Sequence, residues 1–289
     1  MAVLNCVQLH SARSDMNLRS RALVLAAICI FIGAALQADD EPIRIGLVPD
    51  GLAPEERAPL RAYLTKAMGR PVTLVMPALY TDTLAGLANG NLDFACLGAA
   101  MYVRAHAEQG VIPLVQRTSD LQFHSAFITG VKSSIHSLSD LRGKSFAFGD
   151  INSTSGHLIP YRELKEAGID PATDLKFRYS GGHPLTAVLV ESGAVDAGVL
   201  DETVFSSLVS SGKIDKNKVR VFYTSKPFVD YVYVARKAVP AAEREKFVHA
   251  LLALKEGESD PVLKISPSQT ICGSQRRGIR NDSADRQGT

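Results

Sequence analysis

The stretch from Lys144 to Pro160 reads KSFAFGDINSTSGHLIP, and its character changes in the middle. Its first part, Ser145 to Phe148, is a short apolar run that ends at Gly149-Asp150, which predicts a buried strand. After the hydroxyl-rich run Ser153-Thr154-Ser155-Gly156, apolar residues recur at helical spacing as far as Leu164. The sequence therefore predicts a strand that enters the N-terminus of a helix through a turn of serine and threonine.

This turn has the composition of an anion-binding site. The first N–H groups of a helix lack intrahelical partners and lie at the positive end of the helix dipole. The hydroxyls of Ser153, Thr154 and Ser155 add hydrogen-bonding groups there, so the turn can surround a tetrahedral oxyanion without lysine or arginine. The alternative is an ordinary helix cap, because serine and threonine are favoured at that position anyway. This stretch alone does not separate the two interpretations.

Strands and helices alternate on both sides of this stretch. Before it, three strands and two helices are predicted in the order 43–48, 55–68, 72–76, 81–88 and 92–97. After it the same order returns: Gly193 matches Gly90 and Asp196 matches Asp93, and in both pairs the spacing is 103 residues (193 minus 90, 196 minus 93). The alternation predicts parallel sheets covered by helices, and the repeat predicts two lobes of like topology.

The same spacing predicts where a ligand would bind. It pairs Tyr80 with His183, each just before a predicted helix, and Gly98 with Asp201, each just after a predicted strand. In open α/β sheets, ligands bind beyond the carboxyl ends of the strands, where all four positions lie. Two such faces, one in each lobe, predict a cleft between the lobes.

Two extended segments, residues 123–131 and 231–236, separate the predicted halves. A chain that leaves one lobe and later returns to it crosses twice, so these segments are predicted to be hinge strands that permit closure around a ligand. The predicted boundaries are 39–125 together with 231–265 for the first lobe and 126–230 for the second.

Composition and the N-terminus bear on location. The 289 residues are 46% hydrophobic and 21% charged with a net charge of +2, which is typical of a soluble protein and argues against a nucleic-acid surface. Two arginines precede the apolar run Ala22 to Leu36, and small residues follow it up to Ala38. This order predicts a secretory signal over residues 1–38, with Met16 as an alternative start and cleavage after Ala38.

The last segment differs from the rest of the chain. From Ser266 to Thr289 the sequence has no apolar periodicity and is rich in Ser, Gly, Arg and Asp, which predicts a disordered, divergent tail that a frame shift would explain. Removal of the signal would leave Cys96 and Cys272, too few for a disulfide framework.

Several stretches together carry a family resemblance: Phe146 to Pro160, Gly181-Gly182-His183, Val195 to Asp201 and Pro227 to Tyr231. In these stretches the chain resembles the phosphate-, phosphite- and phosphonate-binding proteins of ABC transporters, and the resemblance runs from about Ile43 to Ile265. It implies an α/β, two-lobed type II periplasmic-binding-protein fold. Each lobe would have a mixed, mostly parallel sheet flanked by helices, and two hinge strands would join the lobes.

The resemblance also implies ligand-binding residues, which are hydroxyl, aromatic, imidazole and carboxylate groups: Tyr80, Tyr102, Ser153, Thr154, Ser155, His183, Asp201 and Asp230. Core packing is the alternative for the two tyrosines, helix capping for His183, and a solvated loop position for the acids. An acid in an anion site makes chemical sense if it accepts a hydrogen bond from a protonated ligand oxygen or from an ammonium group of the ligand. Such an acid would repel a fully deprotonated anion such as sulfate.

The implied function is that of a periplasmic binding protein that delivers a small phosphorus oxyanion to an inner-membrane ABC permease, as a monomer and without cofactor or metal. Relatives that take larger aminophosphonates have an aromatic residue where this chain has Leu97, which favours phosphite, methylphosphonate or phosphate. One alternative is a sensing subunit for a membrane kinase, with an oxyanion or arsenite as ligand and Cys96 as the thiol. Another is an enzyme that uses His183 as a base, but the chain has no nucleophile elbow, HExxH, paired CxxC or Walker loop.

Overall fold

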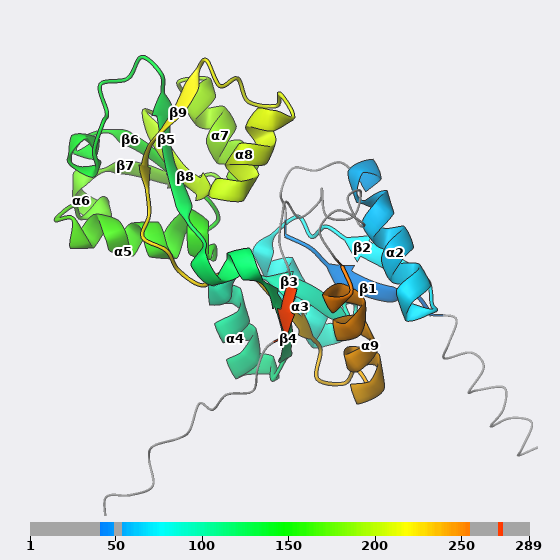
Figure 1. Ribbon diagram of the computed structural model, residues 1–289. Coiled ribbons are helices and arrows are strands. Elements are labelled where there is room, and N and C mark those ends of the chain that lie inside the picture. The colour runs from blue at the N-terminus through cyan, green and yellow to red at the C-terminus, as the bar shows by residue number, and fades with distance from the viewer. Residues whose placement is uncertain (1–40, 49–53, 255–270, 274–289) are drawn as a thin grey trace, which may run out of the picture. The chain divides into compact units, whose positions relative to one another are not determined.

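The computed structural model describes residues 41–48, 54–254 and 271–273. Within these ranges the chain forms two sheets with helices packed against them (Figure 1), in agreement with the predicted α/β class. The predicted signal sequence lies outside the described residues. Among the helices of the described ranges, none has the length and apolar character needed to cross a membrane.

The first sheet has six strands in the order β11-β4-β10-β3-β1-β2. Its strands are β1 (Ile43–Gly46), β2 (Val72–Val75), β3 (Phe94–Leu97), β4 (Ile112–Arg117), β10 (Val232–Ala235) and β11 (Ile271–Gly273). β1 is parallel to β2 and β3, whereas β10 is antiparallel to β3 and β4. The helices are η1 (Pro54–Arg57), α2 (Ala58–Met68), α3 (Tyr80–Asn89), α4 (Ala99–Gln109) and α9 (Ala241–Leu252). We call this sheet with its helices the first lobe.

The second sheet has five strands in the order β7-β6-β8-β5-β9. Its strands are β5 (Ser125–Gly130), β6 (Ser145–Phe148), β7 (Lys176–Tyr179), β8 (Ala197–Asp201) and β9 (Val219–Thr224). β6 is parallel to β7 and β8, and β5 is antiparallel to β8 and β9. The helices are η3 (Leu138–Leu141), η4 (Thr154–Leu158), α5 (Ile159–Glu166), α6 (Pro171–Asp174), α7 (His183–Glu191) and α8 (Glu202–Ser210). This sheet and its helices form the second lobe.

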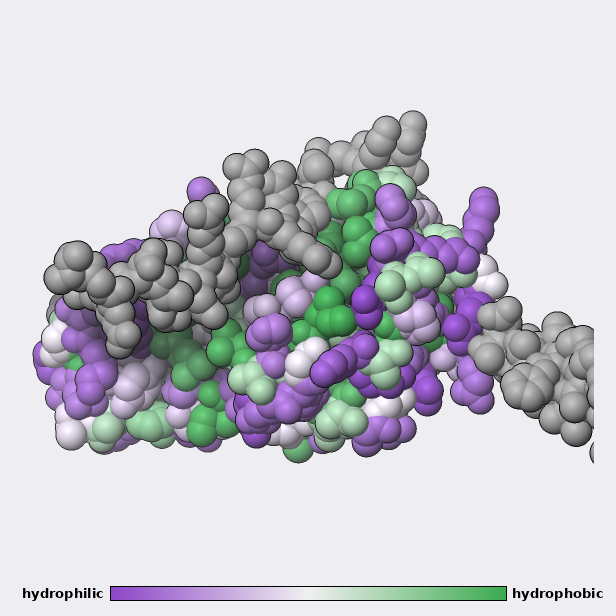
Figure 2. Space-filling model, turned by 90° about the horizontal axis from the view of Figure 1, so that it is seen from below, coloured by the Kyte–Doolittle hydropathy of each residue, from purple (hydrophilic) through white to green (hydrophobic). Residues whose placement is uncertain are grey.

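Successive side chains of a strand point to opposite faces of its sheet, so each sheet has two apolar faces, and helices cover both. In β3, Phe94 packs in a core cluster with α2 and α9, and its ring stacks on that of Phe247 at 4.2 Å. The next residue, Ala95, packs in a separate cluster with α3 and α4. On the molecular face shown in Figure 2, hydrophilic residues lie among the hydrophobic ones, as expected for helices that bury only one side.

The internal repeat holds for the order of the elements, but with a difference in register. In the first sheet Ile45 pairs with Phe94, and in the second sheet Phe146 pairs with Ala197. The third strands of the two lobes are therefore 103 residues apart (197 minus 94), whereas the first strands are 101 apart (146 minus 45). Gly46, which ends β1, and Gly149, which follows β6, are 103 residues apart (149 minus 46) and therefore do not occupy equivalent positions in the two sheets. A shift by two residues leaves each side chain on the same face, so the hydrophobic pattern does not reveal it.

The chain passes between the lobes twice. The predicted hinge segments form β5 and β10, each of which lies within one sheet, so the crossings fall just before them, at residues 118–124 and 225–231. The first crossing includes the short turn η2 (Thr118–Gln122). Phe123 and Phe228 exchange backbone hydrogen bonds of 2.8 and 3.0 Å, so the two crossings are paired with each other.

Part of the predicted tail belongs to the first sheet. β11 pairs in antiparallel register with β4, with Ile271 opposite Arg117 and Gly273 opposite Val115. The expectation of disorder throughout residues 266–289 therefore does not hold for this strand. Three residues are too few for a periodicity to show in the sequence. The other residues of the predicted tail lie outside the described ranges.

Candidate functional site

The predicted strand, turn and helix form as β6, η4 and α5, and the turn between them is tight. Its chain doubles back so that Gly149 N donates to the carbonyl oxygen of Gly156 at 2.8 Å. A Cβ atom on Gly156 would lie 3.2 Å from the Cα atom of Gly149 and 3.0 Å from Ser153 Oγ and His183 Cε1. Only a residue without a side chain permits this approach of two backbone segments. We call residues 149–158 the hydroxyl turn.

The three hydroxyl residues of this turn are buried and have different partners. Ser153 Oγ caps the helix by accepting from Gly156 N at 2.9 Å, and Thr154 Oγ1 accepts from Ala100 N of the first lobe at 3.0 Å. Within the described part of the chain, Ser155 Oγ has no hydrogen-bond partner. An oxygen that accepts from an N–H group can still donate its own proton. All three hydroxyls can therefore serve as donors to an anion.

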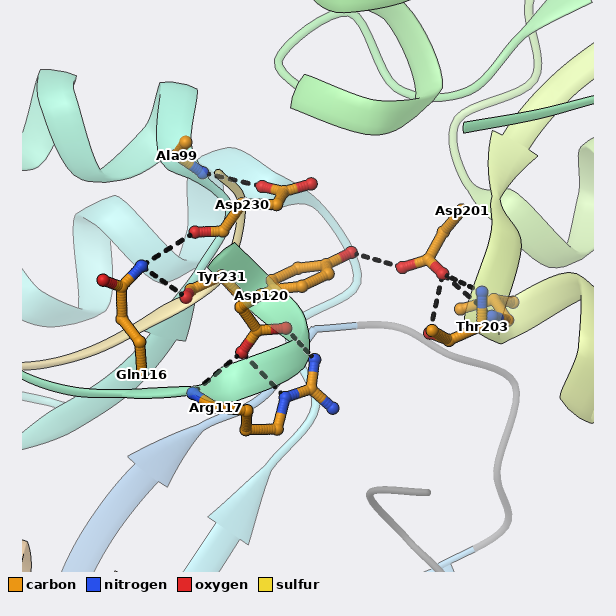
Figure 3. A network of polar contacts seen from close by, with 9 residues as sticks. Ala99, Gln116, Arg117, Asp120, Asp201, Thr203, Asp230 and Tyr231 are labelled. Atoms are coloured by element: carbon orange, nitrogen blue, oxygen red, sulfur yellow. Dashed lines mark hydrogen bonds and ion pairs between the residues drawn. The ribbon is translucent and has the colours of Figure 1, made fainter. Parts of the chain in front are cut away.

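Asp230 lies close to the hydroxyl turn, just before β10. Its Oδ1 atom accepts from Ala99 N at 2.9 Å at the start of α4 (Figure 3), and its side chain is buried. Among the described residues, Oδ2 has no partner. Burial raises the pKa of Asp230 to about 7, although the bond from Ala99 and the hydroxyls of Thr154 and Ser155 act in the opposite direction. Near neutral pH this carboxyl group therefore exists in both protonation states.

Asp201, the counterpart of Gly98 in the repeat, has partners on both of its oxygens. Oδ1 caps α8 by accepting from the backbone N–H groups of Thr203 and Val204 at 2.7 and 2.9 Å. Oδ2 accepts from the hydroxyl of Tyr231 at 2.9 Å, and Figure 3 shows this bond between β8 of the second lobe and the segment before β10. The structure thus gives Asp201 a capping and bridging role, in contrast to Asp230.

Tyr80 and His183, which the sequence pairs across the repeat, contact each other between the lobes. The Tyr80 hydroxyl lies 3.2 Å from His183 Nε2, and Asp201 N donates to His183 Nδ1 at 3.2 Å. Because Nδ1 accepts, the neutral imidazole carries its proton on Nε2, which faces the tyrosine oxygen. Burial raises the pKa of Tyr80, so its hydroxyl keeps its proton and can donate it at neutral pH.

Two other residues named from the sequence lie nearer the core. Tyr102 packs against the cluster of α3 and α4, and its ring centroid is 5.6 Å from that of His106. Cys96 is half-buried in β3, and together with Leu97 and Tyr80 it lines a cavity of about 10 Å³, which has room for one water molecule. Across the described ranges, no group of three or more His, Cys, Asp and Glu residues could hold a metal ion.

The site also includes residues that the sequence analysis did not single out. Arg117 binds Asp120 through Nη2 and Nε at 2.6 and 2.8 Å, and its guanidinium carbon lies 5.8 Å from the centroid of the Tyr231 ring. Gln116 donates from Nε2 to the carbonyl oxygens of Asp230 and Tyr231 at 3.3 and 3.1 Å (Figure 3). These contacts fix the segment that bears Asp230 and Tyr231. In the sequence, the one sign of this segment was the stretch Pro227 to Tyr231, which is part of the family resemblance.

Known proteins resemble this chain in sequence and in fold. A sequence profile of the family described as "ABC transporter, phosphonate, periplasmic substrate-binding protein" matches residues 45–269. The chain is 30% identical over 182 residues to the probable ABC transporter phosphite-binding protein PhnD1 of Prochlorococcus marinus (strain MIT 9301), a match that spans 60% of this chain and 61% of that protein. It is 25% identical over 246 residues to the phosphate-import protein PhnD of Mycolicibacterium smegmatis, spanning 75% and 77% of the two chains.

The solved structure of Prochlorococcus marinus PhnD1 in complex with methylphosphonate superposes with a TM-score of 0.73 at 25% identity. The superposition covers 80% of this chain and 92% of that one, which shows that the two-lobed binding-protein fold is shared. Together with the profile match over most of the chain, these findings establish the family. The chain belongs to the periplasmic substrate-binding proteins of phosphonate ABC transporters.

Proposed function

We propose that this protein captures a small phosphorus oxyanion, namely phosphite, a phosphonate or phosphate, between its lobes and delivers it to an ABC permease in the inner membrane. Family membership supports the transport role and favours it over the sensing alternative. The relative PhnD1 is named for phosphite, and its solved structure is a complex with methylphosphonate. The relative PhnD is named for phosphate import.

One observation supports the ligand class most directly: Ser155 Oγ and Asp230 Oδ2 are buried, and neither makes a well-formed hydrogen bond with the described residues, although the Ser155 hydroxyl lies near enough to Asp230 to lower its pKa. Leaving such an atom unpaired costs about 1 to 3 kcal/mol. A ligand that pairs with both atoms must offer an acceptor to the hydroxyl and a proton to the carboxylate. Monoprotonated phosphate, phosphite and phosphonate carry both kinds of oxygen, whereas sulfate has no proton to donate.

We assign the acceptor role to Asp230 in preference to Asp201, because both oxygens of Asp201 already have partners. Ser153 and Thr154 accept backbone N–H groups and are left with protons to donate, as described above. The N-terminus of the helix adds positive potential without a fixed cation, which suits an anion that must later be released.

Closure of the cleft explains how binding would be signalled to the permease. Side-chain contacts already join the two lobes: Thr154 with Ala100, Tyr80 with His183, and Lys213 with Glu56. Tyr231, at the end of the second crossing, adds a bond to Asp201. A ligand that contacts both lobes adds to these interactions and shifts the population toward the closed state. Nothing in this cycle requires a chemical step, so we propose a binding protein that is not an enzyme.

The proposal includes export and a monomeric state. Cleavage after Ala38 would release the mature chain into the periplasm. A hinged binding protein presents both lobes to its permease, and a monomer leaves both accessible.

The proposal is tested by calorimetric titration of the mature chain with phosphite, methylphosphonate, phosphate, aminoethylphosphonate, sulfate and arsenite. We expect one phosphorus oxyanion to bind and sulfate not to bind. The triple variant Ser153→Ala, Thr154→Ala, Ser155→Ala should lose at least about two orders of magnitude in affinity, because each charge-assisted hydrogen bond contributes roughly 1.5 to 3 kcal/mol.

The control is Ser210→Ala, which removes an exposed hydroxyl bonded to Ser207 O at the end of α8 and should leave affinity unchanged. If the folded protein binds none of the phosphorus compounds, or if the triple variant binds as well as the parent, the proposal is wrong. If arsenite alone binds, the result would favour the sensing alternative, with Cys96 as the thiol.

A further inference from the structure

His157 is a buried side chain of the hydroxyl turn that is not among the proposed ligand-binding residues. Its Nδ1 atom lies 2.8 Å from the carbonyl oxygen of Ile151. A carbonyl oxygen only accepts, so Nδ1 must carry the proton of this hydrogen bond. The bond joins the two ends of the segment 151–157, and Ser153, Thr154 and Ser155 lie between those ends.

The other ring nitrogen of His157 has a partner of a different kind. Nε2 lies 2.9 Å from the hydroxyl of Tyr179 at the end of β7, and in the neutral imidazole it accepts from that hydroxyl. Burial lowers the pKa of His157, against smaller opposite effects from the Ile151 carbonyl and Asp150. The titratable groups that face the ring are Asp150 from the turn, Tyr161 from α5 and Tyr179 from β7.

The imidazole is held in one orientation by aromatic rings from three elements. The ring centroids of Phe148, Tyr161 and Tyr179 lie 5.2, 5.6 and 4.9 Å from that of His157, and all three meet it edge-on. These residues belong to β6, α5 and β7, which are regular elements of the second lobe. The ring can therefore act as a fixed point to which the turn is tied.

The backbone of the turn needs such support. Residues Thr154–Leu158 form a π-helical turn in which Leu158 N donates to the carbonyl oxygen of Ser153 at 3.0 Å. A π-turn is rarer than an α-turn and is frequently found at functional sites. Other hydrogen bonds hold parts of this turn, including Gly149 N to Gly156 O, Gly156 N to Ser153 Oγ and Ser125 Oγ to Ser155 O, but none of these three joins residues 151 and 157.

We propose that His157 is the positioning residue of the oxyanion site, and that its Nδ1–H bond to Ile151 holds the three hydroxyls in their binding arrangement. This inference rests on the proposed function of the turn. His157 acts through the turn, without touching the ligand. The bond from His157 to Tyr179 has a different role: it orients the imidazole ring, but it does not connect the two ends of the segment that carries Ser153, Thr154 and Ser155.

Two substitutions separate the two nitrogens of His157. In His157→Asn the side-chain amide lies near the place of Nδ1 and can still donate to Ile151, but it cannot reach Tyr179. In His157→Gln the amide lies near the place of Nε2, so the bond to Tyr179 is kept and the bond to Ile151 is lost. Tyr179→Phe is the control, because it removes the partner of Nε2 alone.

We expect the Kd for the phosphorus oxyanion to rise little in Tyr179→Phe and moderately in His157→Asn, each relative to the parent. In His157→Gln the Kd should be at least about tenfold higher than in His157→Asn. A role in packing alone predicts the reverse order, because glutamine fills more of the volume of histidine than asparagine does. Urea unfolding of each variant separates loss of affinity from loss of stability. Equal or reversed order of the two His157 variants in Kd would overturn the inference.

Hydrogen exchange of the ligand-free protein gives a second readout that does not depend on binding. Peptides spanning residues 151–158 should exchange faster in His157→Gln than in His157→Asn, with Tyr179→Phe close to the parent. If the parent protein binds none of the compounds, the proposed function is wrong, and the exchange order still decides whether His157 orders the turn. If exchange is equal in the two variants, the positioning role is wrong even where the ligand binds.

Discussion

Among single residues, Asp230 has the largest expected effect on how stability depends on pH. Burial raises the pKa of its carboxyl group from the ordinary 3.8 to about 7. Between these values the folded state holds a proton that the unfolded state has released. The free energy of unfolding should therefore fall as the pH rises from about 4 to about 7, by up to about 1.4 kcal/mol per pH unit.

Urea denaturation at several pH values checks this prediction, with Asp230→Asn as the comparison. The amide has the same shape and can still accept from Ala99 N, but it does not titrate. The variant should lack this decline and gain stability over the parent as the pH rises toward about 8. Parallel curves for the two proteins would show that Asp230 has an ordinary pKa.

At the scale of elements, the tight turn before α5 depends on Gly156. A methyl group there would lie 3.0 Å from Ser153 Oγ and 3.2 Å from the Gly149 Cα atom. Gly156→Ala should therefore displace the turn, destabilise the protein by about 1 to 3 kcal/mol and weaken oxyanion binding by at least about tenfold. Denaturation and titration measure the two effects.

Gly130→Ala is the matched control, because a Cβ atom at the end of β5 would meet only Lys218 O, at an ordinary 3.8 Å. Unchanged binding by Gly156→Ala would mean that the turn is more adaptable than its contacts indicate.

Elements were also the scale at which the sequence was most informative. The alternation of strands and helices follows local rules, and α2 and α3, which end at Gly69 and Gly90, form where helices were predicted. β11 is too short to have a pattern, and the two-residue register shift between the lobes leaves the pattern unchanged. Both depend on pairing between distant segments.

The candidate site shows the same limit. The hydroxyl turn could be predicted because strand, turn and helix are consecutive in the sequence. The contacts of Arg117 with Asp120 and Tyr231, and those of Gln116 with the backbone, depend on how the crossings meet. Sequence reasoning placed Asp201 and Asp230 together in the cleft, but only the structure shows that one has partners on both oxygens and the other does not.

At the scale of the whole molecule, the bond from Tyr231 to Asp201 is a test of closure. Tyr231→Phe removes a hydrogen bond to a buried carboxylate and leaves the cap of α8 in place. Such a bond contributes roughly 1.5 to 3 kcal/mol to the closed state, so ligand affinity should fall about tenfold or more. Small-angle scattering should show a larger radius of gyration for the ligand-free variant than for the parent.

Tyr63→Phe is the control, because Tyr63 donates to Ala250 O within the first lobe. It should lower stability without changing the radius of gyration or the affinity. If both variants scatter as the parent does and Tyr231→Phe binds normally, the Tyr231 bond has no part in closure.

The pairing of Phe123 with Phe228 limits how the molecule can move. Two separate connections would let one lobe twist, slide and bend relative to the other, but two connections joined by their backbones behave as one narrow ribbon. Such a ribbon bends out of its own plane far more easily than it shears. The closing motion of the two lobes is therefore expected to have one main degree of freedom. A single pair of labels, one on each lobe, would then report the entire motion, and any residue that stiffens the ribbon would change the rate of capture without touching the site.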